Sequence, residues 1–164
     1  MICLQGIQKL TLLDFPGKVA CTVFTGGCNL RCPFCHNYEL ADGSAKPAMD
    51  EAELMGFLQK RKGLLDGVVL SGGEPLMQSE ACLELAKAAH GMDLNVWAYT
   101  GYTWETLMQE NDPAQSILCS YRALRLLLIL ARMERRKNME LLAYASAVSH
   151  TYSERLHKKY PAPL

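Results

Sequence analysis

Short apolar segments alternate with helical segments along the first 110 residues, and this alternation restricts the possible folds more than any other feature. The apolar segments predict buried strands at residues 19–25, 67–70 and 94–100. The helical segments are predicted at residues 50–62, 79–90 and 103–110. Asp50 and Glu53 form a capping box at the start of the first helix. This order favours parallel βαβ units with right-handed crossovers, and therefore an α/β fold.

Two unusual loops directly follow two of the predicted strands. The first begins at Gly26 and carries Cys28, Cys32 and Cys35, and the second contains the sequence Gly-Gly-Glu-Pro at residues 72–75. Functional loops of parallel α/β folds leave the carboxyl ends of the strands. We therefore expect the two loops to meet at one edge of the sheet.

The spacing of Cys28, Cys32 and Cys35 is compatible with several kinds of site. Cys32 and Cys35 alone match a thioredoxin-like redox motif, but that interpretation leaves Cys28 without a role. Cys32 to His36 matches the c-type haem attachment motif, which requires an exported protein. A zinc site with three cysteines and His36 is a third possibility, although zinc ligands usually come from two separated pairs. Three buried structural cysteines would be unexpected at this density.

An iron–sulfur cluster accounts for all three cysteines together. Such clusters are bound by cysteine thiolates and normally take four of them. Three thiolates on one loop leave one iron without a protein ligand, and an open coordination position is typical of a site that binds substrate. Gly26 and Gly27 would let the backbone approach the cluster closely. The other cysteines are expected to be small buried hydrophobes, and they are Cys3, Cys21, Cys82 and Cys119.

The cysteine loop, with Phe34 before its last cysteine, and the Gly-Gly-Glu-Pro loop together resemble the radical S-adenosylmethionine superfamily. The resemblance implies a [4Fe–4S] cluster on Cys28, Cys32 and Cys35, whose remaining iron is chelated by the amino and carboxylate groups of the methionine part of S-adenosylmethionine. It implies that the methionine amino group is held by Gly72, Gly73 and Glu74. It also implies that the adenine packs by Phe34, Cys35 and His36. No catalytic residue beyond the cluster is implied, and Gly73→Val is expected to weaken cofactor binding while leaving the cluster in place.

Three further stretches resemble the activating proteins of anaerobic ribonucleoside-triphosphate reductase, and they are residues 6–18, 35–37 and 96–102. Residues 35–37 are also similar to the pyruvate formate-lyase activases. The chain is too short for a full eight-stranded barrel, so the resemblance implies a truncated parallel (βα) partial barrel of the radical-SAM type. It implies an oxidoreductase that reductively cleaves S-adenosylmethionine to methionine and a 5′-deoxyadenosyl radical. That radical would remove a hydrogen atom from a glycine of the reductase.

The partners implied by the resemblance are a large glycyl-radical protein and a low-potential electron donor such as flavodoxin or ferredoxin. The alternatives are an activase of another glycyl-radical enzyme, such as pyruvate formate-lyase, and a non-catalytic iron–sulfur or zinc-binding module. We expect no nucleic-acid or membrane partner and a cytoplasmic location. The longest strongly apolar stretch, residues 126–131, is much shorter than the about 18 residues that a membrane-spanning helix needs. Residues 1–13 lack the pattern of a secretory signal.

The composition of the chain changes near residue 115. Residues 1–113 hold 8 Lys+Arg and 14 Asp+Glu, whereas residues 114–164 hold 9 and 3. All 12 glycines lie at or before Gly101, although about four would be expected in the remaining residues. We therefore predict a radical-SAM core domain at 1–115 and an atypical basic tail at 116–164. The tail is either helical around residues 122–132, and docks on the partner, or is the product of a frameshift.

Overall fold

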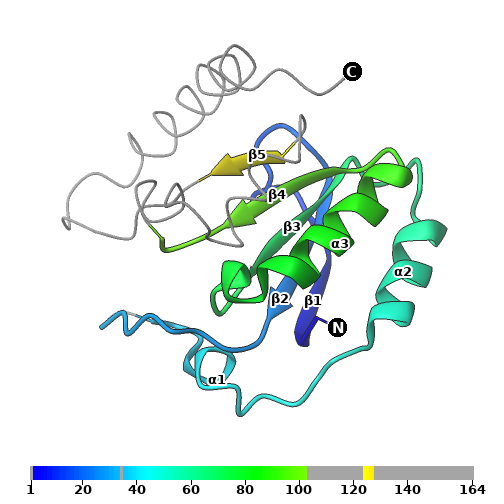
Figure 1. The fold of residues 1–164 in the computed structure, drawn as a ribbon. Helices are drawn as coiled ribbons and strands as arrows, with labels where there is room; N and C mark the ends of the chain where they lie inside the picture. The colour runs from blue at the N-terminus through cyan, green and yellow to red at the C-terminus, as the bar shows by residue number, and fades with distance from the viewer. Residues whose placement is uncertain (1, 34, 103–123, 128–164) are drawn as a thin grey trace.

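A computed structural model describes residues 2–33 and 35–102, together with the backbone of residues 124–127 (Figure 1). The five strands of its sheet lie in the order β1-β2-β3-β4-β5. They are β1 (Leu4–Thr11), β2 (Ala20–Thr25), β3 (Gly67–Gly72), β4 (Asn95–Tyr99) and β5 (Leu124–Leu127). The helices are α1 (Tyr38–Ala41), α2 (Glu51–Lys60), the 3₁₀ helix η1 (Pro75–Gln78) and α3 (Ser79–Gly91). No helix in the described part of the chain has both the length and the apolar character needed to cross a membrane.

The centre of the sheet has the predicted topology. β2, β3 and β4 are parallel neighbours, and α2 and α3 lie on the connections between them. The three predicted strands and the first two predicted helices are thereby confirmed. The third predicted helix, at 103–110, lies outside the described residues. The fold is mixed α/β with a mostly parallel sheet, while its closure into a partial barrel stays a prediction.

β1 was not predicted, and it runs antiparallel to β2. Residues 12–19 join the two strands, and a connection of that length is too short for the crossover that parallel strands require. The register between the strands shifts between Leu4 and Gly6 and again between Gln8 and Thr11. These irregularities interrupt the alternation of buried and exposed side chains that would identify a strand. The prediction that all strands of the sheet are parallel is therefore wrong for β1.

β5 pairs in parallel with β4, with Val96 opposite Leu124 and Tyr99 opposite Leu127. A helix around residues 122–132 was one of the two alternatives for the tail, whereas Leu124–Leu127 form a strand. A short apolar run has no periodicity that separates a strand from a buried helix, so the pattern alone could not decide. The rest of the predicted tail lies outside the described residues, and the division of the chain at residue 115 stays a prediction.

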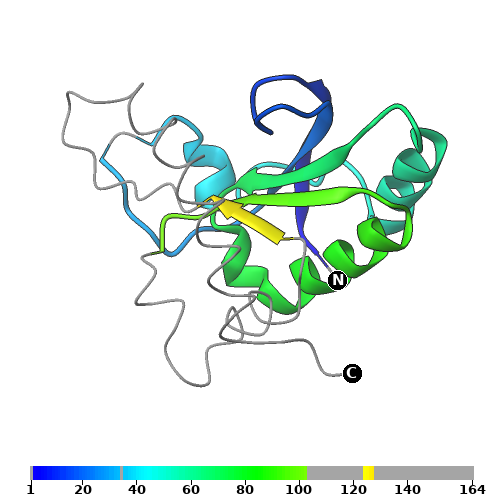
Figure 2. The ribbon, with the colours of Figure 1, turned by 90° about the horizontal axis from the view of Figure 1, so that it is seen from above.

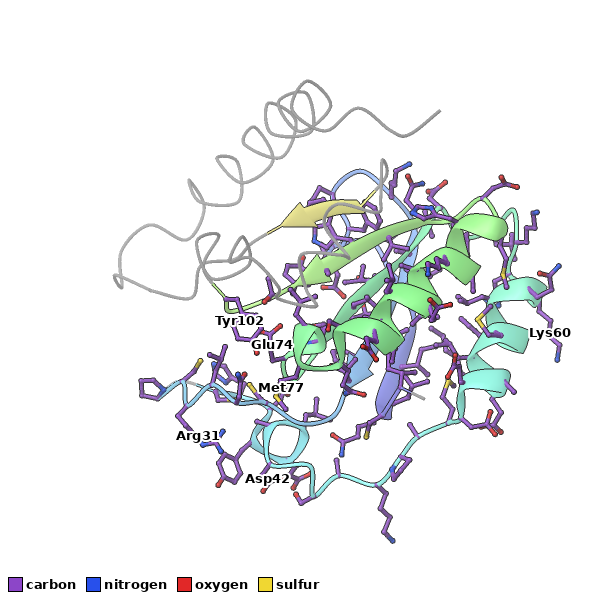
Figure 3. The ribbon with its side chains drawn as sticks, in the orientation of Figure 1. Arg31, Asp42, Lys60, Glu74, Met77 and Tyr102 are labelled. Atoms are coloured by element: carbon purple, nitrogen blue, oxygen red, sulfur yellow. The ribbon has the colours of Figure 1, made fainter. Side chains whose placement is uncertain are left out.

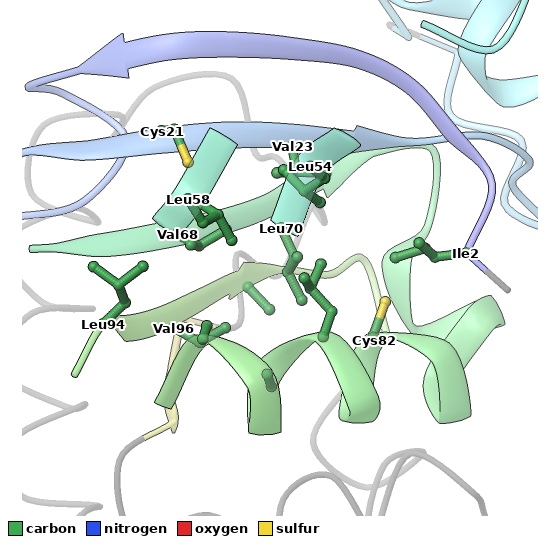
Figure 4. Packing of buried hydrophobic residues seen from close by; sticks show 14 of the residues in the cluster. Ile2, Cys21, Val23, Leu54, Leu58, Val68, Leu70, Cys82, Leu94 and Val96 are labelled. Carbon is green, nitrogen blue, oxygen red and sulfur yellow. The ribbon is translucent and has the colours of Figure 1, made fainter. Parts of the chain in front are cut away.

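The main hydrophobic core lies between the sheet and the helices α2 and α3 (Figure 4). Alternate residues of the strands point into it, as the two-residue period of a strand requires. Leu54 and Leu58, four residues apart on α2, enter the core from the helix side. The strand residues in this core include Cys21, Val23, Val68, Leu70, Val96 and Ala98.

The opposite face of the sheet is covered by the connection between β1 and β2 (Figure 2). Phe15 of this connection is fully buried, and its ring centroid lies 5.1 Å from that of Trp97 in β4. The Tyr99 hydroxyl donates a hydrogen bond to the Asp14 carbonyl oxygen at 2.7 Å. The Thr22 hydroxyl donates to the Asp14 carboxylate at 2.5 Å. The connection is thus anchored to β4, although the two are far apart in the sequence.

The N-terminus of α2 has the predicted capping box. The Asp50 carboxylate accepts a hydrogen bond from the Glu53 N–H at 2.7 Å, and the Glu53 carboxylate accepts one from the Asp50 N–H at 2.9 Å. The two side chains therefore satisfy two backbone N–H groups that would otherwise lack a partner in the helix.

Removing the Asp50 cap should destabilise the domain. We expect Asp50→Ala to lower the free energy of unfolding by about 1 kcal/mol, because a helix N–H loses its acceptor. Urea denaturation measures this difference. Asp50→Asn keeps a side-chain oxygen at the same position and should stay close to the unsubstituted protein. An equal loss in both variants would show that the cap does not account for the effect.

Candidate functional site

The cysteine loop, residues 26–37, and the Gly-Gly-Glu-Pro loop, residues 72–75, lie side by side at the carboxyl ends of β2 and β3. Thr25, the last residue of β2, is in register with Gly72. The Gly73 N–H donates a hydrogen bond to the Thr25 carbonyl oxygen at 2.8 Å. The Glu74 N–H donates to the Gly27 carbonyl oxygen at 2.9 Å. The prediction that the two loops meet at one edge of the sheet is confirmed.

Gly27 connects the two ends of the cysteine loop. Its N–H donates a hydrogen bond to the carbonyl oxygen of Leu40 at 2.8 Å, where the chain has returned from the loop into α1. Its own carbonyl oxygen accepts the bond from Glu74. Its φ of 85° lies in the left-handed region that favours glycine. The cysteines are therefore carried on a loop whose base is fixed at one residue.

The two glycines of the second loop are required by the close approach of the loops. A Cβ at Gly73 would collide with the Gly27 carbonyl oxygen. Gly72 has a φ of 110°, and a Cβ there would lie 2.5 Å from the backbone N and O of Thr25. These contacts explain the glycines without a ligand. The predicted contact of Gly72 and Gly73 with the methionine amino group stays a prediction.

The thiols of Cys28 and Cys32 are half-buried and that of Cys35 is exposed. Burial is the main cause that raises the pKa of Cys28, a backbone hydrogen bond at Leu30 lowers it, and the charges of Glu74, Cys32 and Cys35 raise it further. Arg31 donates hydrogen bonds from Nη1 to the carbonyl oxygens of Cys28 and Leu30 at 2.8 and 2.9 Å.

The structure brings the three thiols onto one loop but not around one point. Within residues 2–33 and 35–102, no three His, Cys, Asp or Glu side chains lie close enough together to hold a metal ion. The donor set nevertheless fits an iron–sulfur cluster, because thiolates are the ligands that such clusters take. Metal binding is also coupled to the folding of the residues that hold the metal. The assignment of Cys28, Cys32 and Cys35 as ligands stays a prediction.

The Glu74 side chain is buried, with 1% of its surface exposed. One carboxylate oxygen, Oε1, accepts hydrogen bonds from the Leu76 N–H at 3.0 Å and the Thr100 hydroxyl at 2.8 Å. The other, Oε2, accepts one from the Gly101 N–H at 2.8 Å. Burial raises the pKa of Glu74, while these hydrogen bonds lower it. Neither Thr100 nor Gly101 was predicted to take part in the site.

The side chains at this edge come from separate elements. Figure 3 shows Glu74, Met77 and Tyr102 grouped beside the base of the cysteine loop, while Arg31 lies farther out along it. His36 is exposed and lines a shallow hollow with residues 37–40 and Ala45. Phe34 lies outside the described residues. The predicted packing of adenine by Phe34, Cys35 and His36 therefore stays a prediction.

Two of the four remaining cysteines are buried as predicted. Burial raises the pKa of Cys21 to about 11 and that of Cys82 to about 12, so both stay protonated near neutral pH and are poor metal ligands. Cys3 is exposed, and its prediction as a buried residue is wrong. It precedes β1, where its backbone N–H donates a hydrogen bond to the Gln78 side-chain oxygen at 2.7 Å. Cys119 lies outside the described residues.

A side chain at Gly73 should disturb the protein itself, not only the binding of a cofactor. The collision with the Gly27 carbonyl oxygen revises the expectation that Gly73→Val leaves the cluster site intact. Even Gly73→Ala is expected to lower the free energy of unfolding by about 1–3 kcal/mol, as overpacking does. Urea denaturation measures this change.

Gly56→Ala is the matched control for Gly73→Ala. A Cβ at Gly56, in the middle of α2, meets nothing within 4 Å. Because alanine is favoured over glycine in helices by about 1 kcal/mol, this variant should be more stable than the unsubstituted protein. Equal stability of the Gly73 and Gly56 variants would contradict the close approach of the two loops.

Comparison with known proteins gives one family match. A family model described as a 4Fe-4S single cluster domain matches residues 14–146. The matched range is most of the chain, and it contains both loops described above. It also extends past residue 115, into residues that the structure describes only at 124–127.

Curated relatives match a shorter part of the chain. One, from Methanocaldococcus jannaschii and assigned as a glycyl-radical enzyme activating enzyme, is 32% identical over 106 residues, which are 65% of this chain and 43% of the relative. The pyruvate formate-lyase-activating enzyme of Clostridium pasteurianum is 34% identical over 117 residues, 66% of this chain and 49% of that enzyme. The 7-carboxy-7-deazaguanine synthase of Rhodospirillum rubrum is 36% identical over 107 residues, which are 65% of this chain and 43% of that enzyme. The chain thus spans less than half the length of these relatives.

The description of the matched family tests one of the predicted cofactors. It confirms the predicted [4Fe–4S] cluster at the level of the family. The activities in the names of the relatives belong to those proteins, of which this chain spans less than half.

Proposed function

The chain belongs to the 4Fe-4S single cluster domain family, and from this premise we propose that it acts as a radical-SAM activating enzyme for a glycyl-radical protein. Cys28, Cys32 and Cys35 would hold the cluster, and the Gly-Gly-Glu-Pro loop beside them would bind the methionine part of S-adenosylmethionine. When bound and reduced, the cluster would supply the electron for cleavage of this cofactor. The protein's own part is to bind the cofactor, orient it and keep water away from it.

The observation that carries this proposal is the fixed pairing of the two loops. The cysteine loop has its base held at Gly27, and the same residue accepts the hydrogen bond from Glu74 of the second loop. The thiols of the cysteine loop and the glycine backbone of the Gly-Gly-Glu-Pro loop are thereby held at the same edge of the sheet. The carboxyl edge of parallel strands is where such folds bind their ligands.

The identity of the partner is the finer part of the proposal. Residues 6–18 and 96–102 resemble the activating proteins of anaerobic ribonucleoside-triphosphate reductase, which supports that reductase as the partner. Relatives named pyruvate formate-lyase-activating enzyme, from Clostridium pasteurianum and Listeria monocytogenes, support pyruvate formate-lyase as the alternative. We propose a flavodoxin or a ferredoxin as the electron donor, and a cytoplasmic location.

The cluster assignment predicts the outcome of four substitutions. After anaerobic reconstitution, Cys28→Ala, Cys32→Ala and Cys35→Ala should each lose the [4Fe–4S] absorption and bound iron, because each removes a thiolate from a set that is already one short. The exposed Cys3 is the control. Cys3→Ala should bind as much iron as the unsubstituted protein, and loss of the cluster in this variant would contradict the assignment.

Cofactor cleavage separates an enzyme from a binding module. The reconstituted, reduced protein should release 5′-deoxyadenosine from S-adenosylmethionine under anaerobic conditions, and chromatography with mass detection measures it. A module that holds an iron–sulfur cluster or zinc without turnover would release none. Absence of 5′-deoxyadenosine would contradict the proposed enzymatic function. It would not contradict the assignment of the cluster ligands, which the cysteine substitutions test separately.

The choice of partner can be decided by electron paramagnetic resonance. The reduced protein with S-adenosylmethionine should generate a glycyl-radical doublet when mixed with purified anaerobic ribonucleoside-triphosphate reductase. Pyruvate formate-lyase, mixed under the same conditions, serves as the comparison. A doublet only with the lyase would transfer the assignment to that enzyme.

A further inference from the structure

We infer that Glu74 is a positioning residue, whose carboxylate holds the end of β4 against the cysteine loop. The inference rests on the proposed function, because the loop that is held carries the predicted cluster ligands. It differs from the role implied by the resemblance, in which Glu74 helps to hold the methionine amino group. Three sets of contacts carry it.

The first set joins Glu74 to the residues that follow β4. Its Oε2 accepts a hydrogen bond from the Gly101 N–H at 2.8 Å, and its Oε1 accepts one from the Thr100 hydroxyl at 2.8 Å. The Thr100 hydroxyl oxygen in turn accepts a hydrogen bond from the Tyr102 N–H at 3.1 Å. Two successive backbone N–H groups are therefore held by this carboxylate, one of them directly and the other through a hydroxyl.

The second set joins the end of β4 to the cysteine loop. Gly101 packs so closely on Leu30 that a Cβ at Gly101 would collide with Leu30 Cδ1. Leu30 lies between Cys28 and Cys32 in the sequence. The position of Gly101 therefore limits where this part of the loop can lie, and Glu74 fixes the position of Gly101.

The third set anchors Glu74 itself. Its N–H binds the Gly27 carbonyl oxygen at 2.9 Å, and its Oε1 caps η1 by accepting from the Leu76 N–H at 3.0 Å. Both ends of the residue are thereby fixed. With 1% of its surface exposed and both oxygens accepting hydrogen bonds from the chain, the carboxylate is already used in holding the protein together.

Thr100→Val separates the two roles of Glu74. Valine keeps the shape of threonine but removes the hydroxyl that Glu74 and Tyr102 share. If Glu74 acts through position, the variant should bind S-adenosylmethionine about tenfold more weakly, because part of the binding free energy must then be spent on ordering the loop. The change that S-adenosylmethionine causes in the electron paramagnetic resonance spectrum of the reduced cluster measures the affinity. Thr100→Ser restores the hydroxyl and should restore both the affinity and the spectrum.

Thr22→Val is the matched control. Thr22 is also a buried threonine that donates to a carboxylate, that of Asp14, but it lies on β2 away from the loop. This variant should lose stability without losing affinity for S-adenosylmethionine. Affinity equal to that of the unsubstituted protein in Thr100→Val, together with weakened binding in Glu74→Gln, would show direct contact with the cofactor and overturn the inference.

A second measurement needs no cofactor. Amide hydrogen exchange at Gly101 should be slow in the unsubstituted protein and accelerated in both Thr100→Val and Glu74→Gln, but not in Thr22→Val. Fast exchange at Gly101 in the unsubstituted protein would overturn the inference even if the protein failed to cleave S-adenosylmethionine. A protein that shows the expected exchange but releases no 5′-deoxyadenosine would instead contradict the proposed function.

Discussion

The hydrogen bond from the Glu74 N–H to the Gly27 carbonyl oxygen holds together two loops that are far apart in the sequence. It can form because the parallel register of β2 and β3 sets Thr25 opposite Gly72, so that both strands end at the same level. It also requires glycine at position 73, where any Cβ would collide with the same carbonyl oxygen. The chemistry proposed for this edge therefore depends on a close backbone approach that the sheet creates and glycine permits.

Burial of the Glu74 carboxylate gives the same edge its rigidity. A buried carboxylate without partners is strongly unfavourable, but this one accepts hydrogen bonds from Leu76, Thr100 and Gly101. Because these donors belong to η1 and to the end of β4, the carboxylate links separate backbone segments. A buried polar network whose members are all satisfied favours one arrangement of the loops, whereas apolar contacts alone would tolerate several.

Features with a local signal could be predicted from the sequence. β2, β3 and β4 are short, mainly apolar runs, and α2 begins at its capping box. β1 could not be predicted because its register shifts remove the alternation, and the leucines of β5 fit a helix as well as a strand. The meeting of the two loops followed from the ends of the strands. The hydrogen bonds of Glu74 with Thr100 and Gly101 could not be predicted in this way. They depend on which strands are neighbours and on the direction of the Glu74 side chain, and no local sequence pattern indicates either.

The anchoring of the β1–β2 connection to β4 also has a consequence for how the chain acquires its structure. Asp14 and its partner Tyr99 are separated by 85 positions, and the ribosome adds only about 5–20 residues per second. The ring of Phe15 is therefore made several seconds before Trp97, the side chain that it packs against. During that interval Phe15 can pack only on the β2 and β3 residues of its cluster, so this face of the sheet is completed late in translation.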